Sequence, residues 1–200
     1  MTIVILAEGK TERSIRPVLQ AFLNEAAEAG GKHPVGLAVK SYKGSELWDA
    51  DAVTEDARRR LASGRAQAVV VLADAYPKFR TPDEVVRHYR GLRDHRFRVH
   101  CALHDFEAWL LPHWERVFQI AGKTPPKRYP WRPPEDVNLA KPPSRVLSEL
   151  FAPRRGYEKA IDAPRILRSP DDLRVSAAAC PQLRAFLNTL LEFAGYGARI

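Results

Sequence analysis

The sequence predicts an α/β protein with a mostly parallel, four-stranded sheet and helices on both faces. Apolar runs and amphipathic helical segments alternate four times along the first 123 residues, the pattern of a doubly wound sheet with right-handed crossovers. The run at 68–73 (AVVVLA) is apolar without alternation, which is typical of a central strand covered on both faces.

The first two strands and their helices follow from residue periodicity. Residues 2–7 form an apolar strand, and apolar residues then recur at helical spacing until the glycine pair at 30–31. Pro17 must lie in the first turn of that helix or kink it. An alternating strand at 35–39 and a helix at about 50–62 follow.

The second half of the sheet begins at strand 68–73 and is continued by a strong helix start. Thr81 is the expected N-cap, with a proline at the first helical position and a glutamate placed to close a capping box, and the helix runs to about residue 92. Residues 97–103 alternate as the fourth strand. The segment HDFEAW at 104–109 opens a further helix, which Pro112 interrupts and which ends near residue 122.

The chain changes character after the α/β core, which we assign to residues 1–123. Residues 124–143 hold seven prolines together with Tyr129 and Trp131, and we expect an irregular strap lying across the body. Helices are expected at about 144–151, after the N-cap Ser169, and at 181–194. Residues 124–200 therefore form a strap and a helical appendage packed on the core, within a single domain.

Composition limits the classes of function. The chain has 200 residues, 45% of them hydrophobic, and a formal net charge of +8. That charge favours a polyanionic partner, nucleic acid first, although a basic surface that is merely solvated explains it equally well. No apolar stretch approaches the ~20 residues of a membrane span, and no signal peptide is evident, so a cytoplasmic protein without a membrane partner is expected. Cys101 and Cys180 are expected to be packing residues. The oligomeric state stays open.

The stretch VILAEGKTER at 4–13 resembles the end of a nucleotide-binding P-loop. The P-loop pattern requires a second glycine five residues before Gly9, where this chain has Val4 inside a buried strand. A phosphate-wrapping ring therefore cannot form, and the turn is left to serve another purpose.

Four carboxylates follow the predicted strands. Glu8 follows the first strand, Asp74 the third, and Asp105 and Glu107 the fourth. The carboxyl ends of parallel strands share one edge of a sheet, so these side chains are expected to converge there. Carboxylate ligands favour Mg²⁺ or Mn²⁺, and an acidic metal site in a basic protein suits phosphodiester chemistry.

Each of these residues also has an ordinary structural interpretation. Glu12 either complements the dipole of the first helix or supports the metal ligands. Asp74 is otherwise a helix or turn cap, Glu107 an N-terminal helix charge, and His104 a satisfied structural group. Their shared position at one sheet edge favours the joint functional interpretation.

The strand-EGKTE-helix segment, the apolar strand ending at Asp74 and the HDFEAWLL segment resemble the Toprim-like proteins. More closely, they resemble the bacterial family known as domain of unknown function 4276, whose C-terminal pattern is similar to residues 138–143, 157–159 and 179–181. The resemblance covers most of the chain and includes, more distantly, the Toprim domains of OLD-family nucleases.

The Toprim resemblance implies residue roles. Glu8 matches the glutamate after the first strand and Asp74 the first aspartate of the D-x-D pair, whereas Tyr76 stands where the second aspartate is expected. Glu107 would supply a third ligand beside Asp105. The residues expected to contact substrate are Gly9, Lys10, Thr11, Lys78, His104 and Lys141.

We therefore expect a Toprim-like, Mg²⁺- or Mn²⁺-dependent nuclease or phosphotransfer domain acting on DNA or RNA. The resemblance also implies a role in bacterial antiviral defence with a partner ATPase. The alternative is a catalytically degenerate protein that binds nucleic acid or a regulatory partner. A small-molecule or nucleotide binder that uses the Gly9 turn is the third class.

Overall fold

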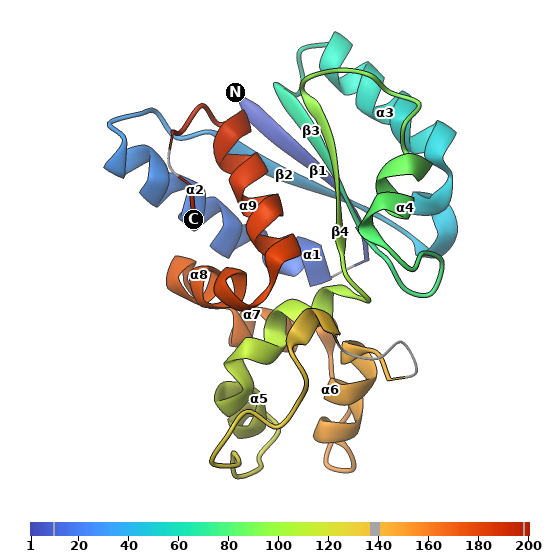
Figure 1. Ribbon diagram of the computed structural model, residues 1–200. Helices are drawn as coiled ribbons and strands as arrows, with labels where there is room; N and C mark the ends of the chain where they lie inside the picture. Colours follow the sequence, from blue (N-terminus) through green and yellow to red (C-terminus); the bar gives the residue numbers. More distant parts are fainter. Residues whose placement is uncertain (10, 137–140, 198) are drawn as a thin grey trace.

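The computed structural model describes residues 1–9, 11–136, 141–197 and 199–200 (Figure 1). Within these ranges the centre of the molecule is a four-stranded sheet, all parallel, in the order β2-β1-β3-β4. The strands are β1 (Thr2–Glu8), β2 (Gly36–Tyr42), β3 (Ala68–Asp74) and β4 (Phe97–Ala102). The inner strands β1 and β3 are almost wholly buried, as expected for strands covered on both faces. The predicted α/β class is confirmed.

Helices cover both faces of the sheet (Figure 1). Along β1 the buried side chains alternate, so that Ile3 and Ile5 pack on one face and Val4 and Leu6 on the other. The helices of the first face are α2 (Arg16–Ala29) and α9 (Pro181–Phe193), and those of the second are α3 (Ala50–Ala62) and α4 (Pro82–His88). No helix in the described ranges is both long enough and apolar enough to cross a bilayer.

A helical layer lies beyond the carboxyl edge of the sheet (Figure 1). Its centre is η2 (Phe106–His113), a 3₁₀ segment whose residues from Phe106 to Leu111 are buried. Around it lie α5 (Trp114–Ile120), η3 (Pro134–Asp136), α6 (Pro143–Phe151), α7 (Lys159–Ile166) and α8 (Pro170–Ala179), while α1 (Thr11–Ser14) and η1 (Gly44–Trp48) follow β1 and β2. The apolar core of the first face continues without a break from β1 into α6, α7, α8 and α9.

Two segments differ from the predictions. The helix predicted from His104 is a 3₁₀ segment followed by α5, because Pro112 lacks the N–H that an α-helix needs and the chain instead forms i→i+3 bonds such as Ala108 N to Asp105 O at 3.1 Å. Helix α7 was not predicted, since Pro164 lies inside it and no side chain caps its start. Burial of Ala163 and Ile166 against the core stabilises it instead.

Candidate acidic active site

Five carboxyl groups come to the carboxyl edge of the sheet from separate segments. Glu8 ends β1 and Asp74 ends β3, which are hydrogen-bonded neighbours. Asp105 and Glu107 follow β4, which pairs with β3. Glu12 lies in α1, directly after the turn that leaves β1. The predicted convergence is therefore observed, and Glu12 is part of it.

The five carboxyl groups form one electrostatic unit, which we call the carboxylate cluster. Burial raises the pKa of Asp74 well above its usual value, and the charges of Glu12, Glu107 and Asp105 raise it further. Burial raises the pKa of Glu12 to about 8, with added repulsion from Glu107 and Glu8. Burial is the largest cause of both shifts, and the charges of the neighbouring acids add to it.

Exposure differs across the carboxylate cluster. Glu107 is 0% exposed, Glu12 3% and Asp105 5%, whereas Glu8 and Asp74 retain partial contact with solvent. Burial raises the pKa of Glu107, Asp105 and Glu8 as well. The cluster therefore has a dry interior and a solvent-facing side marked by Glu8 and Asp74.

Lys159, the first residue of α7, forms an ion pair with the cluster. Its Nζ lies 3.1 Å from Glu107 Oε1, and its side chain is 48% exposed. Burial opposes the charged form of Lys159, but the charges of Glu107 and Asp74 raise its pKa above the ordinary value. Sequence reasoning assigned Lys159 no role, although the segment at 157–159 belonged to the C-terminal pattern on which the family resemblance rested.

Backbone and indole N–H groups fix three of the carboxylates. Asp74 Oδ1 accepts from Phe106 N at 2.9 Å, at the first residue of η2, so Asp74 also caps that segment as the structural interpretation held. Asp105 Oδ2 accepts from Ser144 N at 3.1 Å in the first turn of α6. Trp48 Nε1 donates to Glu8 Oε2 at 3.2 Å.

The donor chemistry of the cluster fits a hard divalent cation. Its donors are carboxylate oxygens, which Mg²⁺ and Mn²⁺ prefer. Glu12 Oε2 and Asp105 Oδ1 are buried with no hydrogen-bond partner among the residues described. Across those same residues, however, no set of three or more His, Cys, Asp or Glu side chains has an arrangement ready to hold a metal ion. Ligation would therefore require the side chains to re-orient and an ion to displace the Lys159 ammonium.

The predicted substrate-contacting residues differ in their distance from the cluster and in their contacts. Lys78 Nζ lies 5.3 Å from the ring centroid of Trp48, the residue that donates to Glu8, so it is linked to the cluster through one side chain. His104 adjoins the cluster, has a left-handed backbone (φ 70°) and leaves Nδ1 buried without a hydrogen-bond partner in the described ranges. Burial lowers the pKa of His104, so its imidazole is neutral near pH 7.

The remaining predicted contacts lie at the Gly9 turn and just before α6. Gly9 adopts a left-handed φ of 98°, and its N–H donates to Tyr42 O at 3.3 Å, which removes it as a free donor for phosphate. Lys10 lies outside the described residues, and of Thr11 only the backbone position, at the start of α1, is described. Lys141 forms an ion pair with Glu149 at 2.6 Å on the exposed side of α6.

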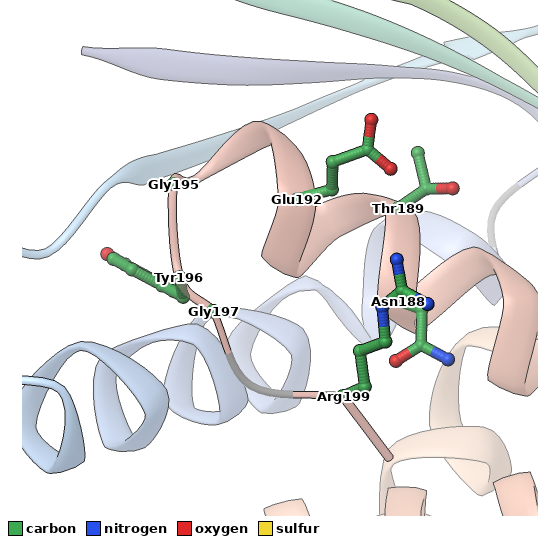
Figure 2. Close-up of a pocket in the computed structure, with 7 residues that line it drawn as sticks. All are labelled: Asn188, Thr189, Glu192, Gly195, Tyr196, Gly197 and Arg199. Atoms are coloured by element: carbon green, nitrogen blue, oxygen red, sulfur yellow. The ribbon is translucent and has the colours of Figure 1, made fainter.

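The cavity shown in Figure 2 is separate from the carboxylate cluster. It encloses about 370 Å³ and is lined by Asn188, Thr189, Glu192, Gly195, Tyr196, Gly197 and Arg199 at the end of α9. Gln67, which directly precedes β3, donates to Phe193 O, so this end of α9 lies at the opposite edge of the sheet from the cluster. The cavity therefore has no part in the acidic site.

The fold and the cluster together define an α/β protein with an all-parallel sheet and a group of interacting acids at its carboxyl edge. The family model described as "Domain of unknown function (DUF4276)" matches residues 7–191. The chain belongs to that family, as its sequence resemblance predicted. No curated protein and no solved structure matches it.

Proposed function

We propose that this chain is a Toprim-like, Mg²⁺-dependent nuclease or phosphotransfer protein that acts on nucleic acid at the carboxylate cluster. One observation carries the proposal: five carboxyls at one edge of the sheet have raised pKa values, and the ion pair from Lys159 reaches one of them, Glu107. A cluster with this excess of negative charge attracts a divalent cation, because an ion relieves the repulsion among the acids.

Glu8, Asp74 and Glu107 would hold the ion, with Asp105 beside them. These acids come from the ends of neighbouring strands and from η2, so the sheet sets their relative positions. When bound, the ion would activate a water and offset charge on the scissile phosphate. An ion entering the cluster would release Lys159 from Glu107, and the freed ammonium would then be available to a substrate phosphate.

Glu12 is suited to proton transfer. It is 3% exposed, and burial brings its pKa to about 8 without an ion; a cation bound beside it would lower that pKa, so that Glu12 could accept a proton near neutral pH. Sequence analysis left two roles open for Glu12, complementing the helix dipole or supporting the metal ligands. We add a third role for Glu12, that of a proton acceptor.

Contacts for the flanking phosphates surround the cluster. Lys78 lies beside Trp48 on the Glu8 side, and His104 adjoins Asp105. The net charge of +8 favours a polyanionic substrate in general. Partnership with an ATPase and a role in antiviral defence stay predictions of the Toprim resemblance.

Cleavage assays test the proposal directly. Single- and double-stranded DNA and RNA are incubated with Mg²⁺ or Mn²⁺ and with wild type, Glu8→Gln or Glu55→Gln, the last being a matched change at an exposed acid of α3. We expect metal-dependent cleavage that Glu8→Gln lowers by about 100-fold or more and Glu55→Gln leaves intact. Equal cleavage by wild type and Glu8→Gln would remove the cluster from the reaction.

The alternative is a degenerate relative that binds nucleic acid or a protein partner without catalysis. Two observations favour it: Tyr76 occupies the place of the second Toprim aspartate, and the Lys159 ammonium already neutralises part of the cluster. Titration calorimetry separates the two proposals. The catalytic proposal requires Mg²⁺ uptake that Glu8→Gln and Asp74→Asn abolish, whereas the alternative predicts salt-sensitive nucleic-acid binding without ion uptake.

A further inference from the structure

An aromatic groove lies on the helical layer, remote from β1 and β3. It has a volume of about 580 Å³, and its walls include Pro112, Trp114, Tyr129, Trp131 and Val175. It joins three segments that are distant in the sequence: the junction of η2 with α5, the proline-rich strap, and α8. We call this the strap groove.

The aromatic walls of the strap groove are held in place before any ligand arrives. Trp131 packs against Phe118 with ring centroids 5.8 Å apart and against Tyr129 at 5.7 Å in an edge-to-face geometry. Tyr129 and Trp131 both pack on the apolar core, and the Tyr129 hydroxyl is buried. Fixed rings lose little entropy when a flat ligand stacks on them, so the groove is preorganised for stacking.

Positive charges near the strap groove indicate the chemical class of its ligand. Lys127, Arg128 and Arg132 flank the Tyr129–Trp131 segment in the sequence, and all three are exposed. An adjoining hollow of about 310 Å³ shares Pro112 and Trp114 with the groove and is lined by Arg116 and Arg168 as well as one acid, Glu115.

These cations are mostly uncommitted. Arg116 is bound to Asp172 at 2.8 Å, but Lys127, Arg128, Arg132 and Arg168 have no ion-pair partner within the residues described. Stacking surfaces interleaved with free cations complement a ligand that alternates flat rings with phosphates. A proline-rich peptide would use the rings but not the cations.

We propose that the strap groove binds unpaired bases of single-stranded nucleic acid, with Arg128, Arg132 and Arg168 contacting the phosphates. This inference deepens the proposed function, because it assigns the strandedness of the ligand. Paired bases within a duplex hide their faces from the rings, so the groove favours single strands. Segment η2 links the two sites, with Glu107 in the cluster and Pro112 at the groove, about 10 Å apart at a 3₁₀ rise of ~2 Å per residue.

Binding is measured by fluorescence anisotropy with a labelled oligothymidine of about 16 nucleotides, the upper site size of known single-strand modules. EDTA is present throughout, so that ion-dependent cleavage does not enter the readout. A duplex of the same length and a proline-rich peptide serve as competitors. We expect the oligothymidine to bind and neither competitor to displace it at equal concentration.

Val175 offers variants that leave the core intact, because its side chain is 53% exposed on α8. Val175→Glu places a negative charge in the groove and is expected to raise Kd about tenfold, whereas Val175→Lys leaves or lowers it. Val86→Glu, at an exposed valine of α4 away from the groove, is the matched control and should bind as wild type. Trp131→Ala is expected to raise Kd about tenfold and Trp131→Phe by less, since phenylalanine keeps a stacking ring.

Salt dependence tests the phosphate contacts. Arg128→Ala with Arg132→Ala should lower the slope of log Kd against log[salt] by about 1.4, at ~0.7 per phosphate contact in a single strand. Arg65→Ala, at an exposed arginine in the loop before β3, should leave the slope unchanged.

Displacement by the proline-rich peptide, or equal effects of Val175→Glu and Val175→Lys, would overturn the inference. So would a wild type that binds no oligothymidine. Cleavage by the wild type is measured in a separate assay with Mg²⁺. Binding that depends on the groove, without cleavage, would contradict the proposed nuclease function and leave the inference about the strap groove standing.

Discussion

The molecule has two groups of buried acids that differ in how their charge is balanced, and helix α7 contributes a residue to each. Its first residue, Lys159, contacts Glu107 in the carboxylate cluster, and its charge also acts on Asp74. Its fourth residue, Asp162, is 0% exposed, yet it is surrounded by donors. Arg155 bonds both carboxylate oxygens at 2.8 and 2.6 Å, Glu158 N donates at 2.9 Å, and Arg165 lies at 3.7 Å.

Asp172, in the first turn of α8, follows the same pattern as Asp162. Burial acts to raise its pKa, but hydrogen bonds from Arg116 and from Arg168 N bring the pKa below its ordinary value. Both acids of this helical layer are thus bonded by several donors, and these bonds keep Asp172 ionised. The acids of the cluster have raised pKa values instead, which is costly for stability and typical of functional sites.

Among the variants that test this difference, the largest loss of stability is expected at Arg155. Arg155→Met leaves Asp162 buried with less compensation, and we expect the free energy of unfolding to fall by about 3 kcal/mol. Denaturant unfolding at neutral pH measures it. Arg174→Met, which breaks exposed pairs with Glu25 and Asp171, should cost less than about 1 kcal/mol. Similar losses in both variants would contradict the structural role of Asp162.

Asp74→Asn is expected to separate activity from stability. It removes one of several mutually repelling charges, so the free energy of unfolding should stay level or rise, while metal-dependent cleavage falls by about 100-fold or more. Paired cleavage and unfolding assays check both values. A loss of stability as large as that of Arg155→Met would place Asp74 with the structural acids, through its bond to Phe106 N.

The pH dependence of stability reports the raised pKa of Glu12. A carboxyl whose pKa is about 8 in the folded protein and 4.5 in the unfolded chain contributes stability below pH 4.5 and loses that contribution as pH rises through 8. We expect Glu12 to account for a loss of about 3 kcal/mol between about pH 5.5 and 8, and Glu12→Gln to lose less than wild type by that amount. Mg²⁺ should offset the loss at the higher pH. The same pH profile in wild type and Glu12→Gln would show that Glu12 does not titrate in this range.

The smallest effect is expected at Lys159, which has a matched control in Lys141. Both lysines are about half exposed and pair with a glutamate, but Glu107 is 0% exposed and Glu149 is 47% exposed at the side chain. Lys159→Met should cost about 1 kcal/mol at neutral pH and less at acidic pH, because burial raises the pKa of Glu107 and a protonated Glu107 no longer needs the cation. Lys141→Met should show almost no cost at either pH. Denaturant unfolding at neutral and acidic pH measures the loss of stability in both variants. Equal losses in Lys159→Met and Lys141→Met would show that Glu107 carries no buried charge that Lys159 compensates.

Much of the fold was open to prediction because its signals are local. The apolar run at 68–73, the cap at Thr81 and the cap at Ser169 each specify an element within a few residues, and β3, α4 and α8 form there. Helix α7 carries no such signal, with Pro164 inside it and no side-chain cap from Glu158, and tertiary contacts stabilise it: burial against the core and the bonds of Asp162 to Glu158 N and Arg155.

The site was predictable in position but not in partners. Glu8 and Asp74 end parallel strands, and topology alone then brings them to one edge. Lys159 comes from a segment 85 residues beyond Asp74, and no spacing rule connects the two. Likewise, the charge state of Glu12 depends on burial by distant segments, which local sequence does not encode.

The sequence by itself therefore determined the parallel sheet and the edge at which its acids gather, since side-chain periodicity and strand direction are properties of short segments. Tertiary structure alone decided which acids are neutralised and which stay in mutual repulsion. That outcome depends on desolvation and on the approach of the Lys159 ammonium, both of which arise only when the C-terminal helices close over the end of the sheet.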